Sequence, residues 1–180
     1  MSDVTPTPDA AVRTARVTDA PDMGVLQAQA WHHDYSGTLP QDVLAELSPD
    51  LFTATWQASL QDPPSTVHRA LVATEGDRVV GLAAIGPTDE PGVGELLVLT
   101  VDPSARRRGH GSRLLNAAVD TLRANDFREI RAWVPATDEQ TRTFLQAAGV
   151  APDGAFRDRE LGSSPDLLRE VRLVAGIVNE

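Results

Sequence analysis

One stretch, residues 95–115, constrains the fold of this chain more than any other. Residues 96–101 form an apolar run that is too short for a typical helix and rich in β-forming residues, so they predict a buried strand that Pro103 ends. From Gly111 onward, apolar side chains recur at helical spacing on one face. That face consists of Leu114, Leu115, Ala118 and Leu122. The chain therefore passes from a buried strand through a short turn into an amphipathic helix.

The turn between strand and helix carries an R-x-x-G-x-G pattern formed by Arg106, Gly109 and Gly111. Glycine lets the backbone approach a ligand closely, and the first N–H groups of a helix have no partner within the helix. The helix dipole adds partial positive charge at the same place, which favours anions. The pattern therefore predicts a site for a diphosphate.

Two better-known phosphate loops do not fit this turn. A P-loop requires a lysine after its second glycine, and the chain contains no lysine. The dinucleotide-binding fingerprint requires three spaced glycines, and only two are present here. The remaining alternatives are a different phosphate loop, or an ordinary turn whose glycines relieve crowding and whose arginines face solvent.

The pattern resembles the acyl-CoA loop of the GNAT superfamily of N-acetyltransferases, which carries [QR]-x-x-G-x-[GA] after a strand that ends in Val-x-Pro. Here Val101, Asp102 and Pro103 provide the strand end, and residues 106–111 provide the loop. The resemblance is strongest over residues 95–149 and extends, through the order of elements, over nearly the whole chain.

The remaining pattern predicts one α/β domain over residues 11–180, after a polar, proline-containing lead-in over residues 1–10 that we expect to be disordered. The predicted strands cover residues 11–17, 70–74, 79–85, 96–101, 129–134, 156–161 and 167–175, and the predicted helical regions cover 21–31, 43–60 with a break at 48–50, 111–125 and 138–148. This order matches a GNAT-like mixed, mostly antiparallel sheet flanked by helices. The resemblance adds that the central strand is splayed from its neighbour.

Composition excludes several classes of function. The chain has no cysteine, which rules out disulfides, thiolate metal sites and a cysteine nucleophile, and it has no run long enough to span a membrane. The N-terminus lacks an apolar signal core, so we expect a cytoplasmic protein. A net charge of −10 argues against a nucleic-acid partner, including a ribosome-associated or RNA-modifying role for the three consecutive arginines.

The negative charge is unevenly distributed along the chain. Residues 1–90 hold 13 acidic residues and 4 arginines, a net charge of −9, whereas residues 91–180 hold 13 acidic residues and 12 arginines, a net charge of −1. The acidic half is suited to attract a cationic amine, although solubility explains it equally well.

The resemblance implies transfer of an acetyl group from acetyl-CoA to a primary amine of a small molecule or peptide, by direct attack and without a metal. The cofactor would be held by the turn, by backbone groups freed on the splayed strand, and by a residue where the family commonly has an asparagine. These residues are Arg106, Arg107, Arg108, Gly109, His110, Gly111 and Ser112 in the turn, Leu99, Thr100 and Val101 on the strand, and Asp138. Of these, we interpret the His110 side chain as structural.

Glu95 is the candidate general base, because many family members carry a glutamate at this position that deprotonates the amine. The tyrosine that often protonates the leaving thiolate is replaced by Leu145. Tyr35 is the only tyrosine, and the pattern leaves open whether it reaches the site or binds substrate; we favour water as the proton donor. Trp31 and Tyr35 border the acceptor pocket in the family, although their helical spacing also suits core aromatics.

Three questions stay open at this point. The missing tyrosine allows an alternative function, a GNAT fold that binds acyl-CoA as a sensor without turnover. Dimers are common in the family, so a homodimer is open. His32 and His33 are neighbours about 100° apart on a helix, and we therefore reject a zinc site there.

Overall fold

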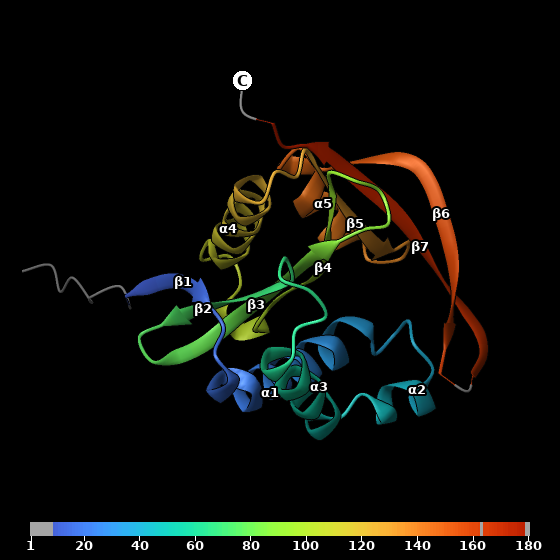
Figure 1. Ribbon diagram of the computed structural model, residues 1–180. Coiled ribbons are helices and arrows are strands. Elements are labelled where there is room, and N and C mark those ends of the chain that lie inside the picture. The colour runs from blue at the N-terminus through green and yellow to red at the C-terminus, as the bar shows by residue number, and fades with distance from the viewer. Residues whose placement is uncertain (1–8, 163, 179–180) are drawn as a thin grey trace, which may run out of the picture.

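The computed structural model describes residues 9–162 and 164–178, which form a single sheet with helices on both faces (Figure 1). The strands are β1 (Ala10–Thr14), β2 (Arg69–Glu75), β3 (Arg78–Pro87), β4 (Val93–Val101), β5 (Glu129–Pro135), β6 (Ala151–Leu161) and β7 (Ser164–Gly176). The α-helices are α1 (Ala20–Tyr35), α2 (Gln41–Glu46), α3 (Pro49–Gln61), α4 (His110–Ala124) and α5 (Glu139–Ala147). No helix in the described range has the length and apolar character needed to cross a membrane.

The seven strands lie in the order β1-β2-β3-β4-β5-β7-β6, and the single parallel pair among them is β4 with β5. The predicted mixed, mostly antiparallel sheet is confirmed. The predicted break in the second helical region is also present, because Ser48 caps α3 by accepting a hydrogen bond from the Leu51 N–H, and Pro49 follows it.

Several boundaries differ from the sequence-based expectation. Strand β1 ends at Thr14 rather than residue 17, β4 begins at Val93 rather than residue 96, β7 begins at Ser164 rather than residue 167, and α1 ends at Tyr35 rather than residue 31. Strand β1 begins at Ala10, so the last residue of the predicted lead-in belongs to the sheet, and residues 1–8 lie outside the described part. Strand β6 begins at Ala151 rather than at residue 156. Its register with β7 shifts between Pro152 and Phe156, where Pro and Gly hide the strand pattern.

The two faces of the sheet carry separate cores. On one face α4 and α5 cover a core that includes Leu114, Leu122 and Ile130. On the other face α1 and α3 cover a core that includes Met23 and Trp56. Trp56 is buried in this core, and its indole N–H donates to the Gln27 side chain at 2.7 Å.

A third apolar cluster places the β6–β7 hairpin beside α2. Leu39, Val43 and Leu44 form its buried part, and Leu161 and Leu168 of the hairpin pack against them. Figure 1 shows the hairpin extending past the sheet and descending beside α2. This contact forms one wall of the cavity described below.

The predicted splay of the central strand is confirmed and begins at a β-bulge. Pairing of β4 with β5 ends at Leu96, which lies opposite Ala132. On the other side of β4, the register with β3 shifts at the same place, so that Leu97 is an extra residue between two paired positions. Beyond Leu97, β4 keeps its bonds to β3 while β5 diverges, which leaves one backbone edge of β4 open.

We expect Leu114→Ala to lower the free energy of unfolding by about 3 kcal/mol, because this fully buried side chain fills the space between α4 and the sheet. Urea unfolding measures the change. Leu167→Ala is the matched control: its side chain is 59% exposed, and its loss should change stability by less than about 0.5 kcal/mol. Equal losses in the two variants would contradict this packing.

Candidate active site

The predicted anion site lies at the start of α4. Gly109 directly precedes the helix with φ of +85°, a left-handed conformation that a side chain disfavours, and no side chain caps the first N–H groups of the helix. Arg107 also has a positive φ, 66°. The chain therefore turns tightly into α4, with backbone donors free for a ligand at the positive end of the helix dipole.

Gly111 lies where α4 and α5 approach each other. A Cβ at this position would lie 3.4 Å from the Phe144 ring and 3.9 Å from Val101. Both are ordinary contact distances, so alanine would also fit, in agreement with the glycine or alanine of the family pattern.

The side chain of Arg106 is engaged within the protein, whereas the sequence predicted a role at the phosphate. Its Nη1 and Nη2 donate to the two oxygens of Asp34 at 2.7 and 2.8 Å, and its Nε donates to the Val101 carbonyl at 3.1 Å. A bidentate arginine–carboxylate pair fixes orientation as well as charge. Arg106 therefore ties the loop to the end of α1 and to the open end of β4.

The electrostatics of Asp34 agree with this pairing. Burial raises the pKa of the Asp34 carboxyl, but the hydrogen bonds from Arg106 and His33 outweigh it and leave the pKa below its usual value. Asp34 therefore stays ionised at neutral pH and holds the Arg106 guanidinium.

A second carboxylate, Glu75 at the end of β2, holds the rest of the loop. Arg108 Nη1 lies 3.1 Å from both Glu75 oxygens, and His110 Nε2 lies 2.7 Å from Oε1. The bond from His110, followed by that from Arg108, lowers the pKa of Glu75. His110 is buried, as expected for a structural residue. Within the described residues, Arg107 alone of the three arginines has no acidic partner, and it is exposed.

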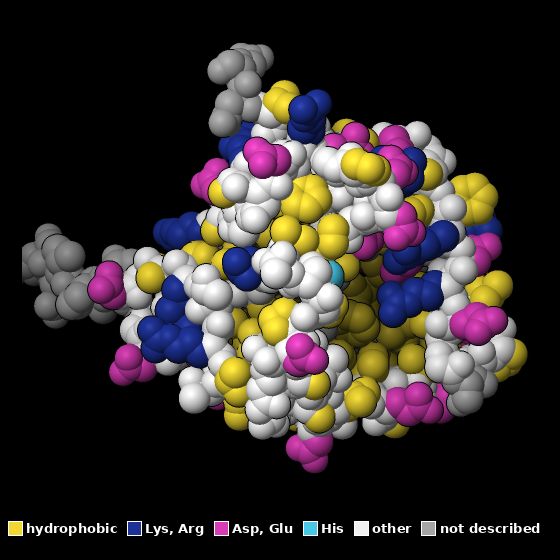
Figure 2. Space-filling view, in the orientation of Figure 1, with side chains coloured by type: hydrophobic (Ala, Val, Ile, Leu, Met, Phe, Trp, Pro, Cys, Tyr) yellow, Lys and Arg dark blue, Asp and Glu magenta, His cyan; other side chains and the backbone are white. Residues whose placement is uncertain are grey.

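A cavity of about 300 Å³ lies where β4 and β5 separate. It is bounded by the splayed strands, by α1 and α2, and by the β6–β7 hairpin. Figure 2 shows a hollow lined by hydrophobic side chains, with arginine side chains at its right rim. Thr100 and Leu99 line it, together with Asp138 and the fully buried Leu145. The cavity thus joins the strand and helix residues that the sequence predicted for the cofactor.

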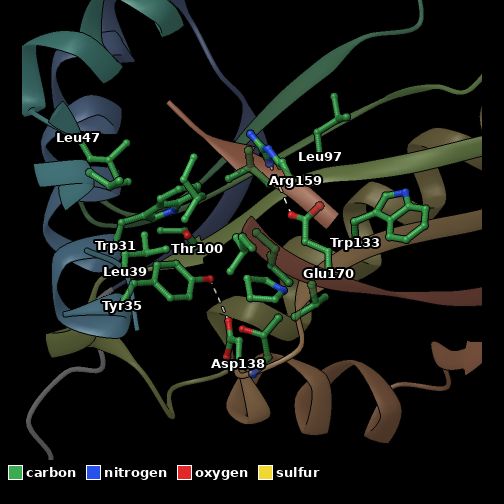
Figure 3. Close-up of a pocket in the computed structure, with 18 of the residues that line it drawn as sticks. Trp31, Tyr35, Leu39, Leu47, Leu97, Thr100, Trp133, Asp138, Arg159 and Glu170 are labelled. Atoms are coloured by element: carbon green, nitrogen blue, oxygen red, sulfur yellow. Dashed lines mark hydrogen bonds and ion pairs between the residues drawn. The ribbon is translucent and has the colours of Figure 1, made fainter. Parts of the chain in front are cut away.

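The two aromatic residues predicted for the acceptor side, Trp31 and Tyr35, form one wall of this cavity (Figure 3). Their rings pack edge to face with centroids 5.5 Å apart. The Tyr35 hydroxyl donates to Asp138 Oδ2 at 3.0 Å, while Asp138 Oδ1 caps α5 through the Thr141 N–H. Burial and the Asp138 carboxylate raise the pKa of Tyr35 far above its usual value, so the phenol stays protonated.

Glu95, the candidate base, lies on β4 just before the bulge. It is half-buried and lies opposite Gly86 of β3 and Arg131 of β5. Burial raises the pKa of its carboxyl, and the positive charge of Arg157 lowers this pKa by less. Arg131 is held by other carboxylates, with bonds of 2.6 to 2.8 Å to Glu129 and Glu90. Glu95 therefore retains a carboxylate free to accept a proton, but it lies next to the cavity, which β4 lines from Leu96 to Thr100, and not in its wall.

Glu170 is a cavity residue that the sequence-based reasoning missed. It is buried on β7, accepts a hydrogen bond from Arg157 Nε at 2.6 Å, and lies 3.5 Å from Arg159 Nη1 (Figure 3). The Arg157 guanidinium also stacks 4.4 Å from the centre of the Trp133 ring. Arg157 and Arg159 are two residues apart on β6, so their side chains share one face, and Glu170 lies opposite Arg157 on β7. This spacing was a sequence signal that could have revealed the cluster.

The two histidines at the end of α1 form hydrogen bonds to different groups. His32 Nε2 lies 3.0 Å from the Leu47 carbonyl, and His33 Nδ1 lies 3.1 Å from Asp34. Over residues 9–162 and 164–178, no three acidic, histidine or cysteine side chains come together as a metal site would require.

Comparison with known proteins identifies the family. The model of the acetyltransferase (GNAT) family matches residues 28–150, and the chain therefore belongs to the GNAT acetyltransferase family. The family predicted from the loop is confirmed.

Individual relatives share the domain at low identity. The mycothiol acetyltransferase of Beutenbergia cavernae is 30% identical over 82 residues, which cover 46% of this chain and only 28% of that protein. The uncharacterised N-acetyltransferase YuaI of Bacillus subtilis is 27% identical over 151 residues, 82% of each chain. The PaiA N-acetyltransferase of Thermoplasma acidophilum, solved with coenzyme A, has the same fold, with a TM-score of 0.66, 16% identity, and coverage of 90% of this chain and 98% of that one.

We expect the Asp34–Arg106 pair to show a coupling energy of about 1 kcal/mol in a double-mutant cycle of Asp34→Ala and Arg106→Ala, because each side chain holds the other in a bidentate geometry. Chemical denaturation of the four proteins measures it. The coupling should persist at neutral pH and disappear as the pH falls through the lowered pKa of Asp34, since protonation removes its charge. Additive single effects at pH 7 would contradict the pairing.

Proposed function

We propose that this protein transfers the acetyl group of acetyl-CoA to a primary amine of a small molecule or peptide. One observation carries the proposal: an uncapped, glycine-led helix start lies beside an open strand edge, and that edge lines a cavity. CoA contains a diphosphate, which would bind at the helix start, and an extended pantetheine arm, which would lie along the strand edge. Membership of the GNAT acetyltransferase family supports the same activity.

In this proposal the backbone N–H groups of residues 107–112 bind the diphosphate, and exposed Arg107 adds a charge-assisted contact. Arg106 and Arg108 act indirectly, because their ion pairs with Asp34 and Glu75 hold the loop in shape. The pantetheine arm then follows the open edge of β4 past Val101, Thr100 and Leu99. Asp138, at the opposite wall, faces the same cavity.

The chemistry follows from the cavity and from the carboxylate next to it. Glu95 takes a proton from the substrate ammonium, directly or through water, and its burial-raised pKa makes it a better base than an exposed carboxylate. The amine nitrogen then attacks the thioester carbonyl carbon, so a C–N bond forms as the C–S bond breaks, and the nitrogen loses a second proton that water carries to the departing thiolate. Backbone N–H groups on the open edge of β4 are suited to stabilise the charge that develops on the carbonyl oxygen.

The departing thiolate is best protonated by water. Leu145 lacks a proton to give, and it is fully buried in the cavity wall. Tyr35 does reach the cavity, but its pKa is raised above the usual value of about 10, whereas a thiol has a pKa of about 8.5. Transfer of the Tyr35 proton to the thiolate would therefore be uphill. We infer that Tyr35 acts as a fixed hydrogen-bond donor that orients Asp138 and borders the acceptor.

The apolar Leu145 also motivates a second candidate, an acyl-CoA sensor without turnover. Release of free thiol from acetyl-CoA during a broad screen of amines distinguishes the two functions. Turnover that depends on Glu95 would exclude the sensor, whereas tight binding of acetyl-CoA without turnover of any amine would favour it.

We expect Gly109→Ala to raise the Kd for acetyl-CoA by about fivefold or more, because a Cβ disfavours φ of +85° by about 1 kcal/mol and the loop would shift its N–H groups. Isothermal titration calorimetry measures this. Gly154→Ala is a matched control: its φ is +89°, so it carries the same strain, but it lies in β6 and should leave affinity unchanged. Absence of acetyl-CoA binding by the wild type near millimolar concentration would refute the proposal.

For catalysis, we expect Glu95→Gln to lower kcat by about 10²- to 10⁴-fold with little change in the Kd for acetyl-CoA, because only proton removal is affected. The wild-type rate should rise with pH through a pKa above the ordinary glutamate value of about 4.3, and this rise should be absent from the variant. Initial rates of thiol release across pH measure both effects. Glu139→Gln, on the exposed start of α5, is the control; an unchanged pH profile in Glu95→Gln would assign the base elsewhere.

A further inference from the structure

A second cavity, of about 520 Å³, lies next to the first, between α3 and the sheet. It is bounded by α3, by strands β2 and β3, and by the segment that follows α3. Its walls are mostly apolar, with Phe52, Trp56, Leu60 and Ile85 among them. Its volume falls within the range of small-molecule sites, and the proposed transfer of acetyl from CoA does not use it.

The two cavities share a wall made of Leu51, Leu97 and Val98. Leu51 and Leu97 are large apolar residues that are nevertheless 49% and 46% exposed. Leu97 is also the bulge residue at which β4 separates from β5. The apolar surface between the cavities is therefore continuous and open, as expected for a ligand that reaches across it.

Gly86 of β3 lets His68 and Leu97 pack closely against the sheet, at the end of β4 that carries the proposed base. A Cβ at Gly86 would lie 2.7 Å from the ring of His68, which lines the second cavity, and 3.3 Å from Leu97. Gly86 lies directly opposite Glu95 in the β3–β4 pair, and directly paired residues share one face of a sheet. Glu95 lines neither cavity, but its side chain is on the same face of the sheet as Leu97, which lines both and stands two residues further along β4. The cofactor would arrive from the Val101 end of the strand.

The charges of the two cavities are opposite in character. In the described part of the chain, no acidic residue lines the second cavity, and Arg69 is its charged residue. The first cavity is lined by four acidic residues and one arginine, Arg159, which lies 3.5 Å from Glu170. The acidic residues are Glu46, Asp138, Glu160 and Glu170. An ammonium group is therefore favoured on the Glu95 side of the shared wall, and an uncharged apolar group on the other side.

We propose that the second cavity binds the apolar body of the acceptor, and that the acceptor is an amine joined to an aromatic or bulky aliphatic group by a short linker. The inference rests on the proposed acetyl transfer and adds the substrate class. The apolar group lies between α3 and β3, the linker crosses Leu97, and the amine reaches Glu95.

Steady-state acetylation of 2-phenylethylamine and of ethylamine tests this substrate class. Wild type should have a kcat/KM about tenfold or more higher for 2-phenylethylamine, since burial of a phenyl ring adds at least about one power of ten in affinity. Ser59→Phe, which fills the second cavity from α3, should abolish that preference and leave ethylamine unaffected. Ala58→Phe, at an exposed neighbouring position outside both cavities, should behave as wild type.

The result that would overturn the substrate class differs from the result that would refute acetyl transfer. Equal kcat/KM for the two amines, or a preference that survives in Ser59→Phe, would overturn the substrate class while acetyl transfer stands. Loss of hexanoyl transfer from hexanoyl-CoA in Ser59→Phe, with 2-phenylethylamine unaffected, would assign the cavity to the acyl chain and also overturn it. Failure to acetylate any amine would instead refute the proposed function. Circular dichroism and thermal unfolding of both variants establish that they fold.

Discussion

The break in pairing between β4 and β5 is the constraint on which the rest of the structure depends. A single inserted residue, Leu97, shifts the register with β3 at the point where the parallel pairing ends. Without the break, the open strand edge and the cavity beside it would be filled by a continuous sheet. Unpaired backbone groups inside a protein are costly unless a ligand or water satisfies them, so the break indicates a site built for an extended polar ligand.

The end of α1 connects the two strands that separate. Asp34 binds Arg106 in the loop after β4, and its neighbour Tyr35 binds Asp138 in the loop after β5. Two adjacent residues of one helix thus span the cleft and hold both of its sides. Because Tyr35 lines the cavity between β4 and β5 and Arg106 belongs to the glycine-containing loop before α4, the end of α1 physically links the cavity to the proposed cofactor loop.

Much of this architecture was predictable because local patterns determine it. The strand, turn and amphipathic helix of residues 95–115 define the anion site through glycine conformation and helix periodicity, and both are properties of short sequences. The partners of the arginines were not predictable, because Arg106 and Asp34 are far apart in the chain and only the fold brings them together. For Glu170 the alternating arginines of β6 were a signal, but register shifts in the β6–β7 pair hid which residue lies opposite them. The sequence therefore predicted a phosphate contact for Arg106, and only the fold revealed its ion pair with Asp34, which positions the loop.

A crystal structure of the protein with coenzyme A tests the central claim most directly, namely that the cleft between β4 and β5 is the CoA site. We predict that the diphosphate lies within hydrogen-bond distance of the backbone N–H groups of residues 107–112. We also predict that the pantetheine arm follows the open edge of β4 from Val101 towards Leu97, with the sulfur in the cavity lined by Thr100 and Leu145. A diphosphate bound elsewhere, or a β4–β5 cleft closed by strand pairing or by side chains, would contradict the account.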